Sequence, residues 1–395
     1  MPATPGRMPA TPGSSRAAAA AARQPVTLEA VRLQWAAELA VESRAPAMSH
    51  RMKLIAGSAC TRLAEEISFR LCVPLTSTDV HRFNDGECQI QIGESLRGCN
   101  VYIIQSTAAP VNDNLMELLL LISAAKRASA KSVCAIVPYF AYGRQSHQPN
   151  KLRVPIAAAD VAQMMVAMGV DRVLSIDLHC AQIQGFFGPS TPVDNLFAAP
   201  TAVSYFYTKD LVDPVVVSPD ANGVARARLF QQGLAALGAS VGLAVCYGDE
   251  DAMVGNVDGC DVVLVDDMID SGRTLAGAAQ TLKDKGARRI FAFVTHVLFK
   301  QDTAEAIEAS ALDELLVANT TQLPANHREC THKIRQISVG RLIETAVRAI
   351  QTGTSVSELF ASSLQATVLD AEHEAVGAAR SGTPGSKSTS WDDDY

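Results

Sequence analysis

The chain has 395 residues, more than one ordinary hydrophobic core can hold, and this length suits two domains of average size with appendages. Hydrophobic residues make up 48% of it and its mean hydropathy is +0.11, yet no apolar run reaches the roughly 18 residues of a membrane span. Because its formal net charge of −7 lacks the basic surplus of a nucleic-acid binder, we expect a globular protein that uses neither a membrane nor nucleic acid.

Residues 1–51 have the composition of a low-complexity extension. They contain a near-duplicated Met-Pro-Ala-Thr-Pro-Gly, at 1–6 and 8–13, and an alanine run at 17–22. Arginines without any acid before Glu29 are typical of an organelle transit peptide, but the later glutamates favour an untargeted extension. We therefore expect a cytoplasmic protein. The nine cysteines are consistent with this location, because they are scattered without a Cys-x-x-Cys pair and suit a reducing compartment.

Apolar runs typical of buried strands alternate with segments of helical periodicity over most of the remaining chain. The strand-like runs are Lys53–Ala56, Val101–Gln105, Val133–Pro138, Val173–Ile176, Pro214–Ser218, Val262–Val265, Ile290–Val294 and Leu315–Val317. The helical segments include Asn112–Ala130, Ile156–Gly169, Asn222–Leu237 and Arg273–Gly286. This alternation predicts right-handed βαβ units whose parallel sheets are covered by helices on both faces, with ligands at the strand ends.

We expect four parts in this α/β chain. An extension at 1–51 is followed by a first domain at 52–198, a second domain at 199–360 and a disordered tail at 361–395. Within the first domain, the alternating Gln89–Ile92 predicts a half-exposed antiparallel strand.

The segment after Val262–Val265 carries the strongest chemical signal. The strand delivers two adjacent carboxylates, and a Ser-Gly-x-Thr turn then opens a helix. Unpaired N–H groups and hydroxyls at a helix N-terminus can hold a phosphate, while the carboxylates can accept hydrogen bonds from vicinal ribose hydroxyls. An ordinary strand–helix junction with an acidic cap is the alternative. The candidate residues for a ribose phosphate are Asp266, Asp267, Asp270, Ser271, Gly272, Arg273 and Thr274.

This segment resembles the phosphoribosyl-pyrophosphate loop of the phosphoribosyltransferases and of ribose-phosphate pyrophosphokinase, the phosphoribosyl pyrophosphate synthetase. Other segments are similar to the synthetase family, in its order. They are Arg82–Glu87, Glu94–Gly98, Gln105–Ser106, Asn112–Leu118, Pro138–Gln145, Asp177–His179, Gln182–Phe187 and Ser218–Gly223. The resemblance covers about residues 52 to 360 and implies two tandem phosphoribosyltransferase-like domains, the second of which carries the ribose 5-phosphate loop.

The activity that the resemblance implies is transfer of the β,γ-pyrophosphoryl group of Mg·ATP to the 1-hydroxyl of ribose 5-phosphate. Mg²⁺ is the implied cofactor, and ATP and ribose 5-phosphate are the substrates. The implied ATP-binding residues are Asp85, Gly86, Glu87, Arg144, Gln145 and His179, and the implied metal-binding residues are His179, Asp177, Asp194 and Asp220. Since Asp85–Glu87 would reach the nucleotide of a neighbouring protomer, a homo-oligomer is implied, with mixed oligomers with other synthetase subunits as an alternative.

Without the resemblance, several of these positions have structural explanations. A hairpin turn alone would explain Asp85-Gly86. A place in the core would explain His179, and a helix cap alone would explain Asp220. Their joint occurrence at strand ends favours the functional interpretation.

The chain departs from the family at three places. Tyr247–Asp251 is acidic where the family has a basic catalytic loop, Gly188 replaces an acid, and Ser146 stands where an aspartate is usual. We take Lys151 and Arg153 as the nearest candidates for the catalytic cations. A non-catalytic regulatory subunit is the alternative to an active synthetase, and a base-salvage phosphoribosyltransferase is a third hypothesis.

Two further segments resemble the family's regulatory anion-binding segments. Their candidate anion-binding residues are Ser95, Arg97, Ser355 and Ser357.

Overall fold

The computed structural model describes residues 51–147, 153–247, 252–298, 301–323, 327 and 331–356. The predicted extension, except its last residue, and the predicted tail lie outside these residues. Lys151, Ser357 and the acidic Asp249–Asp251 lie outside them as well.

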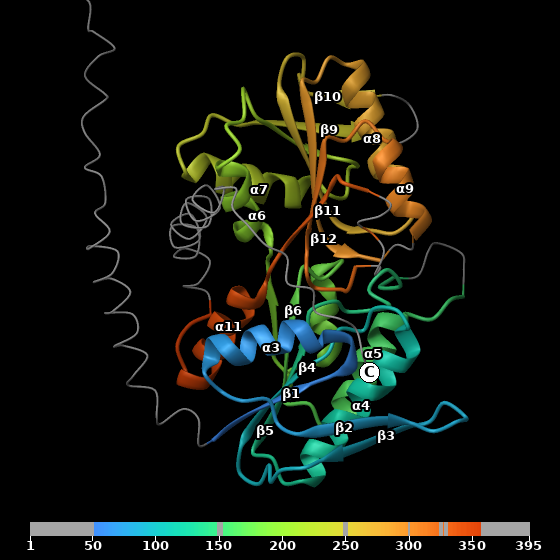
Figure 1. The fold of residues 1–395 in the computed structure, drawn as a ribbon, viewed down its shortest axis with the longest axis vertical. Coiled ribbons are helices and arrows are strands. Elements are labelled where there is room, and N and C mark those ends of the chain that lie inside the picture. The colour runs from blue at the N-terminus through green and yellow to red at the C-terminus, as the bar shows by residue number, and fades with distance from the viewer. Residues whose placement is uncertain are drawn as a thin grey trace, which may run out of the picture. The chain divides into compact units, whose positions relative to one another are not determined.

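The first lobe is built on a five-stranded parallel sheet, coloured blue to green in Figure 1. In spatial order, its strands are β1 (Met52–Ala56), β4 (Asn100–Ile104), β5 (Ser132–Val137), β6 (Arg172–Ile176) and β7 (Val193–Leu196). The helices that connect them are α3 (Thr61–Leu71), α4 (Val111–Arg127) and α5 (Ala157–Ala167), with the short helical turns η1 (Ser58–Cys60) and η2 (Ala181–Phe187). Valine and isoleucine fill the strands because both faces of the sheet are covered.

A two-stranded antiparallel hairpin extends the first lobe. It pairs β2 (Thr78–Arg82) with β3 (Cys88–Ile92), which contains the alternating segment expected to form an antiparallel strand. Alternate β3 residues are partly buried, and β3 packs against α4.

The second lobe is built on a seven-stranded sheet. Its spatial order is β10 (Ala252–Val254), β9 (Gly242–Tyr247), β8 (Val215–Ser218), β11 (Asp261–Ile269), β12 (Arg289–Val297), β13 (Glu314–Ala318) and β14 (Ile334–Ile337). All neighbours are parallel except β10 and β9. The accompanying helices are α6 (Ala199–Tyr207), α7 (Val224–Ala236), α8 (Arg273–Asp284), α9 (Gln301–Ala309) and α11 (Gly340–Thr352). The α/β architecture of parallel sheets flanked by helices is thus confirmed.

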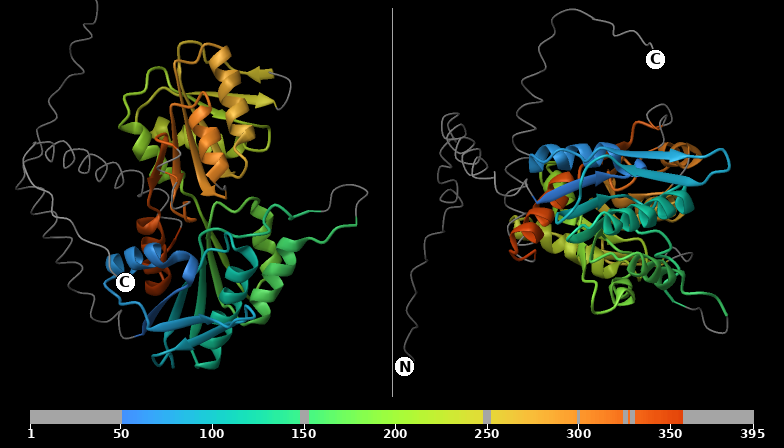
Figure 2. Two further views of the ribbon diagram at one scale, coloured as in Figure 1. Left: turned by 45° about the vertical axis from the view of Figure 1, so that its right-hand side comes forward. Right: turned by 90° about the horizontal axis from the view of Figure 1, so that it is seen from below.

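Helices cover both faces of each sheet (Figure 2). In the first lobe, α4 and α5 pack on one face, and α3 packs on the other. In the second lobe, α8 and α9 cover one face, and α6 and α7 the other. One buried apolar cluster runs from α3 and β1 through α6 and α7 to β12, so the two lobes share part of their core.

Helix α11 follows the last strand of the second sheet but packs against α3 of the first lobe (Figure 1, red against blue). Its buried residues, including Ile343 and Val347, recur at helical spacing and form one apolar face. Its Gln351 side-chain oxygen accepts hydrogen bonds from Asn100 Nδ2 at 3.1 Å and from the Tyr102 hydroxyl at 3.0 Å. The end of the described chain is therefore fixed to the first lobe.

Candidate active site

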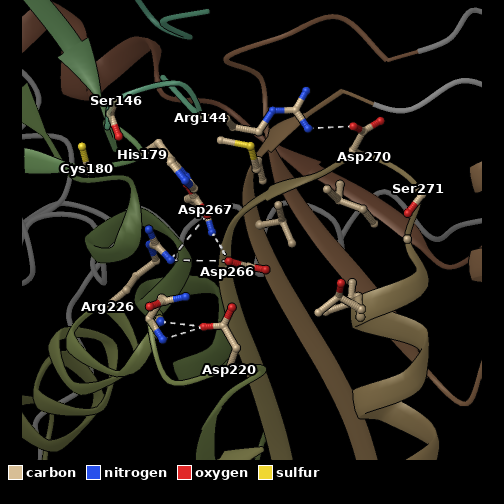
Figure 3. Close-up of a pocket in the computed structure, with 18 of the residues that line it drawn as sticks. Arg144, Ser146, His179, Cys180, Asp220, Arg226, Asp266, Asp267, Asp270 and Ser271 are labelled. Atoms are coloured by element: carbon tan, nitrogen blue, oxygen red, sulfur yellow. Dashed lines mark hydrogen bonds and ion pairs between the residues drawn. The ribbon is translucent and has the colours of Figure 1, made fainter. Parts of the chain in front are cut away.

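A cavity of about 720 Å³ lies at the carboxyl ends of β8 and β11 (Figure 3). These strands are hydrogen-bonded neighbours, although α7, β9 and β10 lie between them in sequence. Ligands in open α/β sheets bind at such a crossover, where loops diverge from adjacent strand ends. The first lobe contributes Arg144 and His179 to the same cavity.

Nine of the residues expected in a site line this cavity. They are Arg144, His179, Asp220, Asp266, Asp267, Asp270, Ser271, Gly272 and Thr274. The structure thus brings the candidate ribose phosphate loop together with two candidate metal ligands, Asp220 and His179, and with the candidate ATP residue Arg144.

The paired carboxylates lie inside β11, whereas the apolar run predicted that the strand ends at Val265. The strand continues to Ile269 because Met268 and Ile269 still pair with β12. Both carboxylates line the cavity, and Asp266 is partly exposed while Asp267 is buried.

Asp267 and His179 form a hydrogen bond between the lobes. The His179 Nδ1 atom lies 2.7 Å from Asp267 Oδ2. This hydrogen bond raises the pKa of His179, with burial opposing it. Because Nδ1 is engaged with Asp267, the other ring nitrogen, Nε2, is left for a ligand.

Arg226, in the first turn of α7, lies beside both carboxylates. Its Nη1 atom is 3.4 Å from Asp266 Oδ1 and 3.6 Å from Asp267 Oδ1. Burial and the adjacent Asp267 charge raise the pKa of Asp266, and Arg226 opposes this rise. Burial would also raise the pKa of Asp267, but His179 and Arg226 together hold it below its ordinary value. The pair therefore combines a strongly ionised carboxylate with one that protonates more readily.

The turn after β11 leads directly into the N-terminus of α8. Gly272 adopts a left-handed φ of +70° immediately before α8, and a Cβ there would lie 3.0 Å from Thr303 Cγ2. The Thr303 hydroxyl donates to the Asp270 carbonyl at 3.0 Å and supports the turn from α9. Ser271, Gly272 and Thr274 line the cavity at the helix N-terminus, where backbone N–H groups favour an anion.

Asp220 holds the turn that precedes α7 and also lines the cavity. Its Oδ1 atom accepts hydrogen bonds from the backbone N–H groups of Asn222, at 2.8 Å, and Gly223, at 2.9 Å. These bonds stabilise the turn before α7, whose N-cap is Gly223, and they use only one carboxylate oxygen. Oδ2 is left for a ligand.

Arg144 reaches across the cavity to the candidate ribose phosphate loop. Its Nη1 atom lies 2.8 Å from Asp270 Oδ2, and both side chains are more than half exposed. A solvent-exposed ion pair contributes little to stability, so either partner can exchange this contact for a ligand.

Two of the expected metal-binding residues do not line the cavity. The Asp177 side chain is buried, and its Oδ2 atom accepts hydrogen bonds from Ala198 N at 3.0 Å and the Thr295 hydroxyl at 2.7 Å. Asp194 is paired with Arg172 on β6 at 2.5 Å. Asp177 thus connects the two lobes, and Asp194 joins neighbouring strands.

The remaining described candidates also lie away from the cavity lining. Asp85, Gly86 and Glu87 form the exposed turn of the β2–β3 hairpin, where Glu87 N donates to Asp85 Oδ1 at 3.1 Å. The other exposed candidates outside the lining are Ser95, Arg97, Gln145, Arg153, Arg273 and Ser355.

Sequence reasoning missed Arg226. The residue lies within a segment expected to form a helix and carries no motif of its own. Its position in the first helical turn after Asp220 was the available signal, because that turn faces the same strand ends.

The donor set suits Mg²⁺ that is held mainly by substrate. Among the described residues, no group of three histidine, cysteine or acidic side chains could enclose a metal ion. Mg²⁺ usually takes one or two carboxylates, substrate phosphates and water, and Asp220 Oδ2 fits that role with His179 nearby.

Comparisons with known proteins match most of the chain that the structure describes. Residues 52–169 match the N-terminal domain of ribose phosphate pyrophosphokinase, and residues 243–361 match the phosphoribosyl synthetase-associated domain. The chain is 44% identical to ribose-phosphate pyrophosphokinases of Vibrio vulnificus, over 317 residues, and Haemophilus ducreyi, over 318 residues. These matches cover 78% of this chain and 99% and 98% of the two relatives. The crystal structure of phosphoribosylpyrophosphate synthetase from Mycobacterium smegmatis is similar, with a TM-score of 0.71, 34% identity and coverage of 77% of this chain and 99% of that one.

Proposed function

The chain belongs to the ribose-phosphate pyrophosphokinase family, and from that premise we propose that it transfers the β,γ-pyrophosphoryl group of ATP to the 1-hydroxyl of ribose 5-phosphate. A bond forms between the ribose O1 atom and the β-phosphorus, and the bond between that phosphorus and the α,β-bridging oxygen breaks. AMP leaves with the bridging oxygen, and the hydroxyl proton passes to solvent. The observation that carries this proposal is the convergence of an acidic pair, a phosphate-binding loop and Arg144 on one cavity.

Each group in the cavity has a distinct task. Asp266 and Asp267 accept hydrogen bonds from the ribose hydroxyls, while the backbone N–H groups and hydroxyls of Ser271–Thr274 hold the 5-phosphate. Arg144 leaves Asp270 to bind the nucleotide phosphates. The protein thereby aligns the attacking hydroxyl with the β-phosphorus, which is its main contribution to phosphoryl transfer.

Mg²⁺ at Asp220 and His179, when bound, would offset the negative charge of the transferring phosphates. Without the metal, the negative phosphates of ATP would lie close to four aspartates with less positive charge to offset the repulsion. These aspartates are Asp220, Asp266, Asp267 and Asp270.

The nucleotide site is completed by a neighbouring copy of the chain in this proposal. Asp85–Glu87 lies on an exposed hairpin turn outside the cavity lining, as a contribution to another protomer requires. We therefore expect a homo-oligomer, and Ser95, Arg97 and Ser355 are candidates for an anion site that regulates it. Mixed oligomers with other synthetase subunits remain the alternative assembly.

Cytoplasmic location is also part of the proposal. Eight cysteines among the described residues are free thiols, as expected in a reducing compartment. No helix in the described parts of the chain is long and apolar enough to cross a membrane.

Formation of AMP by the purified full chain tests the proposal. We expect AMP to form from Mg·ATP only when ribose 5-phosphate is present, with one phosphoribosyl pyrophosphate formed per AMP. Asp220→Asn is the matched variant and should have little activity, because an amide oxygen can still accept the hydrogen bonds from Asn222 and Gly223 while the carboxylate charge is lost. The proposed activity would be contradicted if AMP formed at the same rate without ribose 5-phosphate. It would also be contradicted if no AMP formed at any enzyme concentration.

A further inference from the structure

Arg226 lines the cavity beside the acidic pair of Asp266 and Asp267. Figure 3 shows its guanidinium beside Asp266, with Asp220 near the same carboxylate. The side chain is 22% exposed, so it faces the cavity without being free in solvent.

We propose that Arg226 binds the pyrophosphoryl group during its transfer, as a catalytic residue of the second lobe. This inference rests on the proposed function. The cation that contacts the reacting phosphates is then an arginine of α7. The sequence had instead predicted Lys151 and Arg153 for this role.

The balance of charge in the cavity supports this assignment. Four aspartates line it, and both substrates are anions, so the phosphates need positive partners close by. The described arginines of the lining are Arg144 and Arg226. Arg144 is engaged with Asp270 across the cavity, whereas Arg226 lies nearer the ribose-binding carboxylates. Arg153 is exposed and lies outside the lining.

The contacts of Arg226 also leave it able to bind a ligand. Its two carboxylate contacts, at 3.4 and 3.6 Å, both involve Nη1 and are longer than a strong charge-assisted hydrogen bond. A guanidinium has five N–H donors, so those on Nη2 and Nε remain for phosphate oxygens. Such a planar fork suits the two adjacent oxygens of a phosphoryl group.

A purely structural role makes different predictions. If Arg226 only offset the charges of Asp266 and Asp267, its loss would weaken ribose 5-phosphate binding and leave kcat at saturating substrate unchanged. If it binds the transferring group, kcat and pyrophosphate affinity should fall.

The test compares Arg226→Ala and Arg226→Lys with Arg228→Ala in the full chain. Arg228 is an exposed arginine on the same helix, outside the cavity lining, and its variant should stay within about twofold of wild type. We expect kcat of Arg226→Ala to fall by about 10²–10³-fold, the usual effect of losing one preorganised donor. Arg226→Lys should retain part of the lost kcat, and added guanidinium should partly restore the kcat of the alanine variant.

Calorimetry with inorganic pyrophosphate, in the presence of Mg²⁺ and ribose 5-phosphate, gives a second measurement that needs no turnover. Arg226→Ala should bind pyrophosphate at least about tenfold more weakly, while retained ribose 5-phosphate binding shows that the variant has folded. Unchanged pyrophosphate affinity overturns the inference even if the wild-type chain forms no AMP. Unchanged kcat, or a loss confined to ribose 5-phosphate affinity, overturns it in an active enzyme.

Discussion

His179 Nδ1 lies 2.7 Å from Asp267 Oδ2, and this hydrogen bond joins the loop after β6 in the first lobe to β11 in the second. It brings a candidate metal ligand to the carboxylate pair that the proposed mechanism assigns to the ribose hydroxyls. The histidine is therefore positioned by the same residue that binds the sugar in the proposed mechanism.

The contribution of this bond to stability should depend on pH. Hydrogen bonding to Asp267 raises the folded-state pKa of His179 above its unfolded value of about 6.5, although burial opposes it. The stabilisation is thus fully present below that unfolded value and is lost as pH rises through the folded pKa. The difference in unfolding free energy between wild type and His179→Asn should be larger at pH 6 than at pH 9 in denaturant titrations. An equal difference at both pH values would contradict it.

Ribose 5-phosphate binding should depend on both ends of the loop. Asp266→Ala and Thr274→Ala should each weaken binding by about 1–3 kcal/mol, the scale of losing a hydrogen bond to a charged group. Calorimetry with ribose 5-phosphate measures this loss. Asp79→Ala, at an exposed position on β2, is the control and should bind normally. Unchanged affinity in both loop variants would remove this site from the mechanism.

Arg144 should matter for nucleotide binding far more than for stability. Both members of its ion pair with Asp270 are more than half exposed, so Arg144→Ala should change the unfolding free energy by less than about 1 kcal/mol. Loss of a guanidinium that binds phosphate should weaken Mg·ATP binding by about 1.5–3 kcal/mol. Calorimetry and chemical denaturation separate the two effects. A variant that loses stability but keeps its ATP affinity would show that Arg144 is structural.

Thr295→Val should destabilise the junction between the lobes. The Thr295 hydroxyl donates to Asp177 Oδ2 at 2.7 Å, and both residues are buried. Valine has nearly the same shape but cannot donate, so a buried carboxylate loses a partner at a cost of about 1–3 kcal/mol. Thr61→Val, at an exposed position in α3, provides the comparison in urea unfolding. Equal midpoints for the two variants would contradict the role of this bond.

Complementation between two inactive variants should reveal the shared nucleotide site. Glu87→Ala damages the hairpin contribution and Asp220→Asn damages the cavity, so each homo-oligomer should have little activity. Reassembly of a mixture should restore AMP formation, because some sites then combine an intact hairpin with an intact cavity. Each variant dissociated and reassembled alone is the control. If sedimentation detects mixed oligomers that stay inactive, Asp85–Glu87 does not act in trans.

Local sequence patterns predicted most of the fold and part of the site. The run at Val262–Val265 predicted β11, but not its extension past Asp266, which depends on pairing with β12. The loop at Asp270–Thr274 was predictable because its residues are contiguous and its turn requires Gly272.

Contacts between distant segments were harder to predict. Asp177 was expected to bind metal, but Ala198 and Thr295 occupy its Oδ2 atom, and neither partner is evident from the local pattern. Arg226 was missed because its importance arises from the adjacency of β8 and β11. That adjacency belongs to the order of strands in the sheet, which a linear pattern does not specify.

The packing of α11 on α3 also bears on how the chain folds during synthesis. Helix α3 ends at Leu71, and its partner begins only at Gly340. At about 5–20 residues per second, a ribosome needs roughly 15–55 s to make the intervening chain. Part of the apolar face of α3 therefore stays uncovered on the nascent chain for that time, and we expect chaperones that bind exposed apolar segments to engage it there before α11 emerges.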